Sequence, residues 1–351
     1  MSGKAWPAPG KLNLFLHITG RRADGYHLLQ TVFQFINHCD WLYFTPRTDG
    51  VIQCLSTPNH NVASEHDLTV RAARLLQNYC GATPRDGRSL YGDGPRHHHP
   101  ASSRDGQVPR AQDALEWPSR RTNRTLRLRS SLCGVDIHLD KRLPMGGGLG
   151  GGSSDAATTL VALNQIWGLH LPLEQLAELG LQLGADVPVF IHGQAAWAEG
   201  VGEKLTPIIL PEPWYVVIVP PCHVSTREIF SAPELTRDAP GFTIEGFLSG
   251  LGSAGGVSNV CESVVCQRYP LVAEALAWLR KQIAMIDLVG IDPGAVPVSG
   301  ARMTGTGACV FAAFADESSA RQVVQRLHCE YTESMQGFVA QGMNRSPLHD
   351  E

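Results

Sequence analysis

The sequence predicts an α+β fold, in which strands and helices alternate without a regular strand–helix–strand repeat. Three observations support this prediction. Several short segments alternate apolar and polar residues, as half-buried strands do. Other segments space their apolar residues three or four apart, as amphipathic helices do. The chain has 351 residues, which is more than one domain usually needs, so we expect two domains.

Alternation predicts a first strand over residues 11–18, followed by a turn over residues 20–25. Two further strands are expected over residues 31–36 and 41–45. The first helix is expected over residues 68–77, where Leu and Ala recur at helical spacing.

The composition changes abruptly over residues 81–131. This segment holds ten Arg, no Lys and few apolar residues, and it contains three consecutive histidines at residues 97–99. Such a composition cannot bury enough apolar surface to offset the entropy lost on ordering, so we expect a loosely ordered insertion. A basic binding arm, or a metal site at the histidines, is the alternative reading.

Regular structure is expected to resume after the insertion, with a strand that leads into a glycine-rich loop and two helices that follow it. Later segments continue the mixture of strands, helices and one Gly/Pro-rich loop. The expected strands cover residues 135–140, 214–219, 309–314 and 337–343, the helices cover 155–167, 173–183, 271–283 and 318–327, and the loop covers 284–301.

Composition and charge argue against some classes of function. The formal net charge of −4 gives no reason to expect a nucleic-acid partner. No apolar run approaches the roughly 20 residues that a membrane span requires, and no apolar stretch of a signal peptide is present at the start. Nine cysteines without a C-x-x-C pair are typical of reduced thiols. We therefore expect a cytoplasmic protein, a monomer or weak homodimer, with a small-molecule substrate.

The strongest local motif is the loop at residues 144–154, which contains six glycines in seven positions. Glycine lets the backbone approach a ligand closely, and a helix begins directly afterwards, with Ser153, Ser154 and Asp155 as candidate N-caps. Free amide groups and the helix dipole suit an anion. The segment lacks the Gly-Lys-Ser/Thr ending of a Walker loop. It predicts phosphate binding and leaves the reaction open, with a flexible linker as the alternative.

A second candidate is Asp186, which lies among apolar residues at positions 183–188. An aspartate in this context is either a helix N-cap or a functional group, and the local sequence favours neither. A carboxylate can orient or deprotonate a hydroxyl that attacks a phosphoryl group, and Lys11 is a candidate cation for the developing charge. Nothing local shows that these two side chains meet. A tight turn explains the glycine-rich segment 304–309 as well as a function does.

Three separated motifs, at residues 9–13, 144–154 and 304–307, together resemble the GHMP kinases (galacto-, homoserine, mevalonate and phosphomevalonate kinases). Within that family the chain is most similar to the branch that phosphorylates the 2-hydroxyl of a cytidine diphosphate-linked methylerythritol, in non-mevalonate isoprenoid precursor synthesis. The resemblance covers nearly all of the chain except residues 81–131 and 284–301. It is carried by residues 11–14, 22–27, 140–144, 183–188 and 346–348.

The resemblance implies an N-terminal ATP-binding domain at residues 1–197 and a smaller substrate-binding domain at residues 198–351, with the active site in the cleft between them. It implies that Asp186 is the catalytic base, and that Lys11 favours its ionised form or steadies the transferring phosphoryl group. ATP would be the phosphoryl donor, with Mg²⁺ expected and its ligands unknown. The alternatives are another GHMP kinase, of homoserine or mevalonate type, or a catalytically silent nucleotide-binding homologue.

The resemblance also assigns binding residues. The ATP phosphates would lie against Pro144, Met145, Gly146, Gly147, Gly148, Leu149, Gly150, Gly151, Gly152, Ser153 and Ser154, and Lys141 would lie near the nucleotide. Asp67 stands where the family has an asparagine that contacts adenine, and a carboxylate cannot donate as an amide does.

On the substrate side, the resemblance implies that Asn13 holds the erythritol hydroxyls and that aromatic stacking holds the cytidine. Phe33 and Phe230 can also be read as ordinary core residues. The cytidine pocket would consist of Tyr26, His27, Phe33 and Phe230. Thr306 and Gly307 would lie near the reacting centre, and Thr226 near the nucleotide or substrate.

Overall fold

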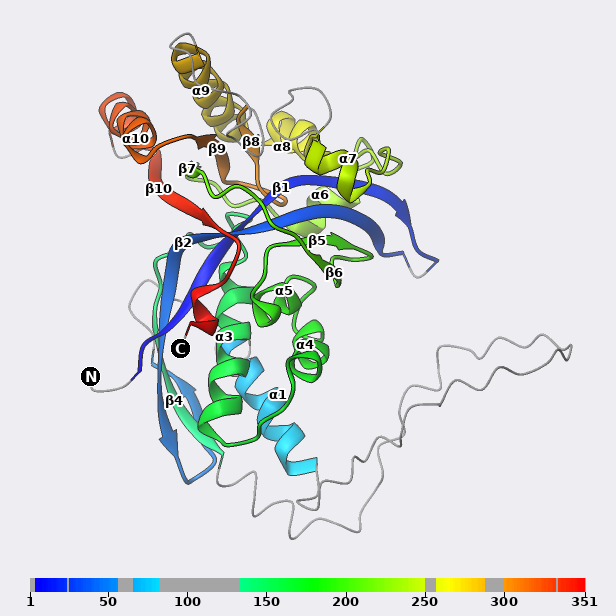
Figure 1. The fold of residues 1–351 in the computed structure, drawn as a ribbon, viewed down its shortest axis with the longest axis vertical. Coiled ribbons are helices and arrows are strands. Elements are labelled where there is room, and N and C mark those ends of the chain that lie inside the picture. The colour runs from blue at the N-terminus through cyan, green and yellow to red at the C-terminus, as the bar shows by residue number, and fades with distance from the viewer. Residues whose placement is uncertain are drawn as a thin grey trace, which may run out of the picture.

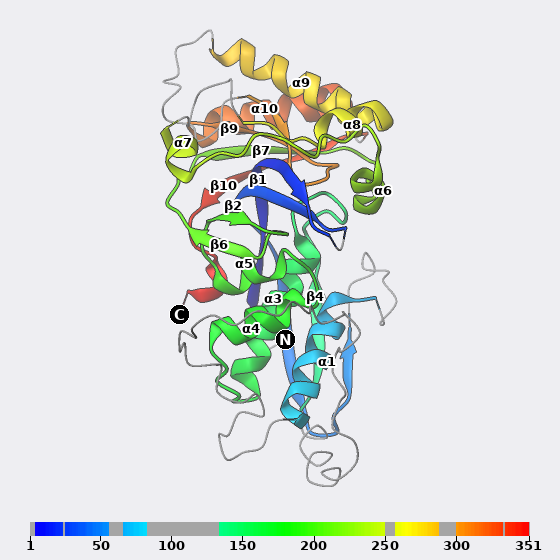
Figure 2. The ribbon, with the colours of Figure 1, turned by 90° about the vertical axis from the view of Figure 1, so that its right-hand side faces the viewer.

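The computed structural model describes residues 4–23, 25–55, 66–82, 133–249, 257–287, 300–332 and 334–350. Figures 1 and 2 show an elongated molecule with two halves, and a long pair of strands runs from one half into the other. Sheet and helices are mixed without a βαβ repeat, so the α+β prediction is confirmed. Most of the predicted insertion, with the histidines at 97–99, and residues 288–299 of the second loop lie outside the described residues.

Within the described residues, ten strands form one connected sheet with the main order β3-β4-β2-β10-β7-β9-β8, while β1 and β5 pair with β2 and β6 pairs with β5. The strands are β1 (Trp6–Arg21), β2 (His27–Arg47), β3 (Ile52–Cys54), β4 (Gly134–Asp140), β5 (Ala196–Glu199), β6 (Lys204–Pro207), β7 (Trp214–Val219), β8 (Arg302–Met303), β9 (Val310–Phe314) and β10 (Gln336–Met343).

Helices cover the sheet in both halves, as Figure 1 shows. One group packs against β1, β2 and β4, and a second group packs against β7, β9 and β10. The helices are α1 (Leu68–Ala82), α3 (Gly151–Ile166), α4 (Leu173–Leu181), α5 (Val187–His192), α6 (Thr226–Ser231), α7 (Ile244–Ser249), α8 (Glu262–Arg268), α9 (Pro270–Asp287), α10 (Glu317–Tyr331) and the 3₁₀ turn η2 (Pro347–His349).

The long antiparallel strands β1 and β2 extend through both halves of the molecule. The two strands are antiparallel, with Lys11 opposite Phe35 and Asn13 opposite Phe33, and an irregularity follows Asn13. Both faces of β1 are buried from Ala8 to Ile18, because helices and strands of the two halves cover it on both sides. Polar residues on this strand are therefore enclosed and must find partners inside the protein.

Separate apolar cores lie in the two halves. In the first, Phe35, Leu76 and Leu160 pack between the sheet and helices α1 and α3. In the second, residues of β7 and β9 pack against α8, α9 and α10. Strand β10 pairs with both β2 and β7, and after it Leu348 returns to the first core, so the chain end connects the halves. The domain division at residue 197 stays a prediction.

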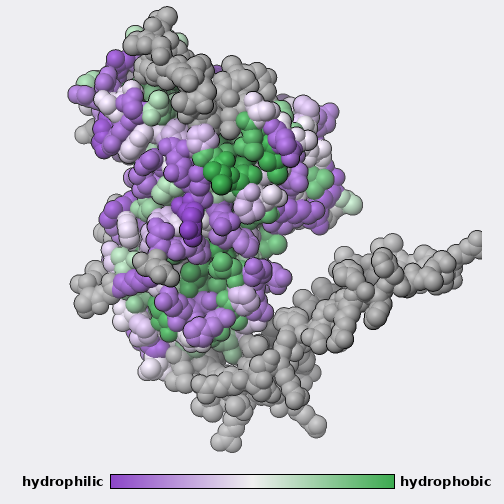
Figure 3. Space-filling model, in the orientation of Figure 1, coloured by the Kyte–Doolittle hydropathy of each residue, from purple (hydrophilic) through white to green (hydrophobic). Residues whose placement is uncertain are grey.

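Several predicted boundaries are wrong, and two of them concern β2 and α9. The strands expected at 31–36 and 41–45 are one 21-residue strand, β2, because the polar residues between them are paired within the sheet and Asp40 is buried. Helix α9 extends to Asp287, so residues 284–287 are helical and not part of a loop. The face shown in Figure 3 is mostly hydrophilic, with apolar residues gathered in patches in both halves. Among the described helices, none combines the length and apolar character of a membrane span.

Candidate active site

An open cavity of about 1080 Å³ collects residues from distant parts of the chain. Its walls come from β1, β2, the glycine-rich loop before α3, the start of α5, helix α6 and the turn at residues 304–307. This volume is at the upper end of the range for small-molecule sites. The cavity therefore has room for a ligand of nucleotide size.

The charge of the cavity wall is strongly biased. Asp186 supplies the one carboxylate among its described lining residues. Four cationic side chains share that lining: Lys11, Arg21, Arg227 and Arg237. These side chains make the lining net positive, although the chain as a whole has a formal net charge of −4. Such a cavity attracts an anionic ligand.

The glycine-rich loop forms one wall through alternate residues. Gly146, Gly148 and Gly150 line the cavity, and all three have positive φ angles. At Gly148 a Cβ atom would lie 2.2 Å from the carbonyl oxygen of Thr304, so glycine is required for the loop to rest on the turn at 304–307. Helix α3 follows at Gly151, with its first turn beside the cavity. This arrangement provides the amide groups and helix dipole that bind phosphate.

The predicted capping of this helix by Ser153, Ser154 or Asp155 is wrong. The N-cap is Gly150 in a left-handed conformation, so the helix begins four residues earlier than expected, and no side chain caps it. The other predicted phosphate-loop residues are not among the residues that line the cavity; these are Pro144, Met145, Gly147, Leu149, Gly151, Gly152, Ser153 and Ser154.

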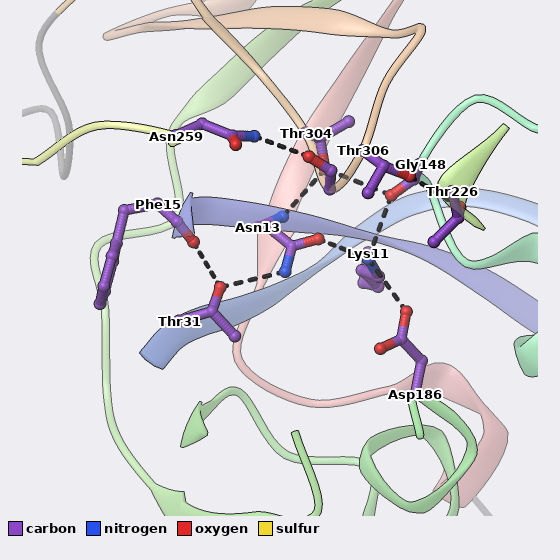
Figure 4. A network of polar contacts seen from close by, with 11 residues as sticks. Lys11, Asn13, Phe15, Thr31, Gly148, Asp186, Thr226, Asn259, Thr304 and Thr306 are labelled. Atoms are coloured by element: carbon purple, nitrogen blue, oxygen red, sulfur yellow. Dashed lines mark hydrogen bonds and ion pairs between the residues drawn. The ribbon is translucent and has the colours of Figure 1, made fainter. Parts of the chain in front are cut away.

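Lys11 and Asp186 meet across the cavity wall, as Figure 4 shows. The Lys11 Nζ lies 3.2 Å from Asp186 Oδ2, and it donates to the Asn13 Oδ1 at 2.5 Å and to the carbonyl oxygen of Gly148 at 3.0 Å. These three acceptors match the three ammonium N–H groups, so the polar end of a lysine side chain that is only 3% exposed has its partners inside the protein.

Asp186 is placed by the start of α5. It is the N-cap residue of that helix, yet its side chain makes no capping hydrogen bond. The carboxylate faces Lys11 and keeps 36% of its side-chain surface exposed. Of the two readings that the local sequence left open, the structure thus favours a carboxylate available to a ligand.

Asn13 holds Lys11 in place through both ends of its amide. Its Nδ2 donates to Thr31 Oγ1 at 3.0 Å, and that hydroxyl donates to the carbonyl oxygen of Phe15 (Figure 4). The orientation of the amide is thereby fixed, with Oδ1 toward Lys11. Asn13 lines the cavity but is only 4% exposed, so contact with a substrate hydroxyl stays a prediction.

The turn at residues 304–307 also belongs to this hydrogen-bond network. Thr304 Oγ1 accepts from the Asn13 backbone N–H at 3.0 Å and donates to the Gly148 carbonyl at 3.3 Å. Thr306 and Thr226 lie with their hydroxyl oxygens 2.8 Å apart at the cavity wall. Asn259 supports the turn by donating to the carbonyl oxygen of Gly305 at 2.7 Å. The motif 304–307 is thus part of the site, with Gly307 in the lining.

The predicted cytidine pocket is brought together at the outer end of the cavity. The rings of His27 and Phe230 stack with centroids 5.3 Å apart and planes inclined by 25°. Tyr26 is 65% exposed at the same end. Phe33 is only 2% exposed and belongs to the core, although it touches the cavity and its ring centroid lies 5.3 Å from Lys11 Nζ. For Phe33 the core reading is therefore largely correct.

Two predicted nucleotide residues do not reach the cavity wall. Asp67 is buried and accepts hydrogen bonds from the backbone N–H and hydroxyl of Thr69, at 2.8 and 2.6 Å, so its carboxylate closes the first turn of α1. Lys141 lies behind the glycine loop, where its Nζ is 2.5 Å from Asp40 and 2.7 Å from Asp155. Burial alone would lower the pKa of Lys141, but the charges of Asp155 and Asp40 outweigh burial and raise it.

Comparison with known proteins shows which family this chain resembles. Descriptions of the N-terminal and C-terminal domains of the GHMP kinases match residues 119–194 and 269–333. A 4-diphosphocytidyl-2-C-methyl-D-erythritol kinase of Nitrosococcus oceani is 49% identical over 98% of this chain and 96% of its own length. The enzyme of the same name from Thiobacillus denitrificans is 46% identical over 99% and 98%. The chain belongs to the 4-diphosphocytidyl-2-C-methyl-D-erythritol kinases, within the GHMP kinases.

Solved structures agree with this membership. A crystal structure of a 4-(cytidine 5'-diphospho)-2C-methyl-D-erythritol kinase has a TM-score of 0.67 and 26% identity, with 97% of this chain and 99% of that chain covered. A mevalonate kinase of Methanococcus jannaschii, at 14% identity and a TM-score of 0.55, shares the fold over 98% of this chain and 99% of its own. Membership of this kinase family confirms the prediction of an ATP-dependent phosphotransferase with an alcohol acceptor.

Several residues that form or support the site were not predicted from the sequence. Arg21 lines the cavity and directly precedes the motif at residues 22–27. The two consecutive arginines at this turn are the sequence feature that could have indicated it. Asn259 and Arg237 follow no recognisable pattern, since each acts through contacts with segments far away in the sequence. Only the tertiary structure brings them to the site.

Proposed function

We propose that the chain transfers the γ-phosphoryl group of ATP to the 2-hydroxyl of 4-diphosphocytidyl-2-C-methyl-D-erythritol, a step in non-mevalonate isoprenoid precursor synthesis. The observation that carries the proposal is the ion pair of Lys11 and Asp186 directly beside the three cavity-lining glycines. The names of the relatives point to the substrate. The cationic lining is consistent with a ligand that carries phosphates.

In this proposal the ATP phosphates lie against Gly146, Gly148, Gly150 and the first turn of α3. Among the described residues no cluster of three or more metal-binding side chains is present, and Asp186 is the one carboxylate in the described lining. This fits a Mg²⁺ ion held mainly by phosphate oxygens and water. When bound, Mg²⁺ would neutralise phosphate charge.

Asp186 would accept the hydrogen bond or the proton of the attacking hydroxyl, because its carboxylate is the exposed partner of the ion pair. Lys11 would act through Asp186. Its three N–H groups already have acceptors, so contact with a phosphoryl oxygen would require it to release one of them. Its positive charge favours negative charge in the adjacent space.

The cytidine base would lie at the outer end of the cavity, beside Tyr26, His27 and Phe230. A bare alcohol such as mevalonate or homoserine would leave this end unfilled. We also propose action in the cytoplasm, which the nine free cysteines support. The domain limits of 1–197 and 198–351 and the state of monomer or weak homodimer stay predictions.

An ADP-release assay with several acceptors tests the proposal. We expect turnover with the cytidine diphosphate substrate, with one added phosphoryl group in the product by mass spectrometry. No turnover is expected with mevalonate, homoserine or free 2-C-methyl-D-erythritol, which lacks the base and diphosphate. Turnover of mevalonate or homoserine alone would identify a sister kinase instead. Nucleotide binding without turnover of any acceptor would identify a silent homologue.

A further inference from the structure

Arg237 connects both members of the stacked pair at the outer end of the cavity. Its Nε donates to the Nε2 of His27 at 3.1 Å. Its Nη2 donates to the carbonyl oxygens of Phe230, at 3.1 Å, and Ala232, at 2.7 Å. Its Nη1 donates to the carbonyl oxygen of Leu235 at 3.0 Å. One half-buried guanidinium thus holds the end of α6 and the ring at the start of β2.

The direction of the bond to His27 fixes the chemistry of that ring. A guanidinium only donates hydrogen bonds, so the His27 Nε2 must carry a lone pair. The neutral imidazole then has its proton on Nδ1. In the part of the chain that the structure describes, no acceptor for Nδ1 is found. A cavity-lining ring therefore has one N–H donor left for a ligand.

Nearby charge keeps this ring neutral. Burial lowers the pKa of His27, and the positive charges of Arg237 and Arg21 lower it further. Arg21 is paired with His27 across the β1–β2 hairpin, and Arg227 and Tyr26 are the other ionisable groups at this end of the cavity. No carboxylate from the described lining opposes these cations here, since Asp186 lies with Lys11.

We infer that Arg237 is a positioning residue for base recognition, which holds His27 as a neutral Nδ1–H donor stacked on Phe230. The inference rests on the proposed function for the identity of the base. An N–H donor complements the O2 and N3 acceptors of a cytosine ring. Arg237 itself acts through His27 and Phe230, and it need not touch the base.

Kinetics of Arg237→Ala test this role. We expect the KM for the cytidine substrate to rise about tenfold or more, with kcat and the KM for ATP within threefold of the natural protein. Without the guanidinium, the His27 pKa should rise, because one of the two cations that lower it is removed. The substrate KM of the variant should then change more between pH 8 and pH 5.5 than that of the natural protein, because the imidazole of the variant gains a charge within this range.

Two further variants separate positioning from a structural role. Arg237→Lys keeps the charge but not the fork of donors, so we expect an intermediate KM and a flat pH profile. Arg268→Ala removes an arginine that pairs with Glu228 and Glu234 on the outer side of the same segment. It should leave the substrate KM and its pH profile unchanged. Equal effects of Arg268→Ala and Arg237→Ala would show that the segment, rather than His27, is what matters.

The tautomer of His27 can be measured without substrate. Long-range ¹H–¹⁵N spectra, assigned with His27→Gln, should show the proton on Nδ1 in the natural protein, and a mixture of tautomers with a higher pKa in Arg237→Ala. A proton on Nε2 in the natural protein, or an unchanged pKa in the variant, would overturn the inference. If the cytidine compound is not turned over, the proposed function fails, and this spectrum still decides the role of Arg237.

Discussion

Two lysine–aspartate clusters lie on either side of the glycine-rich loop, and they differ in their exposure. On the cavity side, Lys11 is buried while its partner Asp186 is 36% exposed. Behind the loop, Lys141 and its partners Asp40 and Asp155 are all 7% exposed or less. A ligand can reach the first cluster through its carboxylate. The second cluster is closed to ligands and can act only through the loop.

The closed cluster joins the two ends of the loop. Asp40 Oδ1 accepts from the backbone N–H groups of Arg142 and Leu143, at 2.6 and 2.7 Å, where the chain enters the loop. Lys141 also pairs with Asp155 on helix α3, where the chain leaves it. The cluster thereby fixes the span that the glycines cross. Of the two lysines beside the loop, Lys11 pairs with a carboxylate that lines the cavity, whereas the partners of Lys141 are buried.

Lys141→Met should have the largest effect on stability. It leaves the buried Asp40 and Asp155 without their cationic partner, and breaking a buried pair in this way costs about 3–5 kcal/mol of unfolding free energy. Denaturant titration measures the loss. Arg142→Met is the matched control, because its ion pair with Asp140 is exposed and should contribute at most about 1 kcal/mol. Equal losses of unfolding free energy in the two variants would mean that the buried cluster contributes no more to stability than the exposed ion pair does.

Gly148→Ala should have an intermediate effect that also reaches the cavity. A Cβ at Gly148 would overlap the Thr304 carbonyl oxygen at 2.2 Å, and φ is +78° there, so we expect about 1–3 kcal/mol of strain or a displaced loop. The KM for ATP should rise about tenfold or more in the ADP-release assay.

Gly168→Ala is the control for Gly148→Ala. Gly168 also has a positive φ of 62°, but its nearest neighbour would lie 4.0 Å from an added Cβ. It should lose some stability and keep its KM for ATP. If Gly148→Ala binds ATP as well as this control does, the close packing of the loop on the turn at 304–307 is not needed for nucleotide binding.

The last expected effect depends on pH. Burial raises the pKa of Asp155 to about 8, so this group contributes stability that is fully present below its unfolded pKa of about 4 and is lost as pH rises toward 8. Asp155→Asn removes that loss. Relative to the natural protein, the variant should therefore gain stability as pH rises from 5 to 8, at no more than about 1.4 kcal/mol per pH unit. A stability difference that is constant over this range would contradict the assigned pKa.

The sequence predicted those elements and site residues that local patterns encode. Helix spacing located α1, α4 and α10, and the glycines located the loop, because such signals lie within a few neighbouring residues. Short elements such as α6 and β8 were not predicted, because a segment of six residues or fewer shows no clear periodicity in its apolar residues. The merged strand β2 also escaped, because Asp40 interrupts its apolar pattern and is neutralised only by Lys141, 101 residues later.

The same distinction applies to the site. Lys11 and Asp186 were predicted as a pair from the family pattern, although their local sequences gave no evidence of contact. Lys141 was predicted near the nucleotide from the same family pattern, and its local sequence does not reveal which side of the loop it occupies. Arg237 was not predicted, since its four acceptors come from two segments that meet only in the fold.

Single-turnover transfer from labelled ATP, followed by rapid quench, tests the role of Asp186 most directly. With both substrates saturating, we expect Asp186→Asn to transfer the phosphoryl group about 10²–10⁴-fold more slowly than the natural protein, as for loss of a general base. Asp155→Asn, in the closed cluster, should stay within tenfold. Transfer by Asp186→Asn at the natural rate would contradict the account, because the exposed carboxylate would then have no part in the reaction.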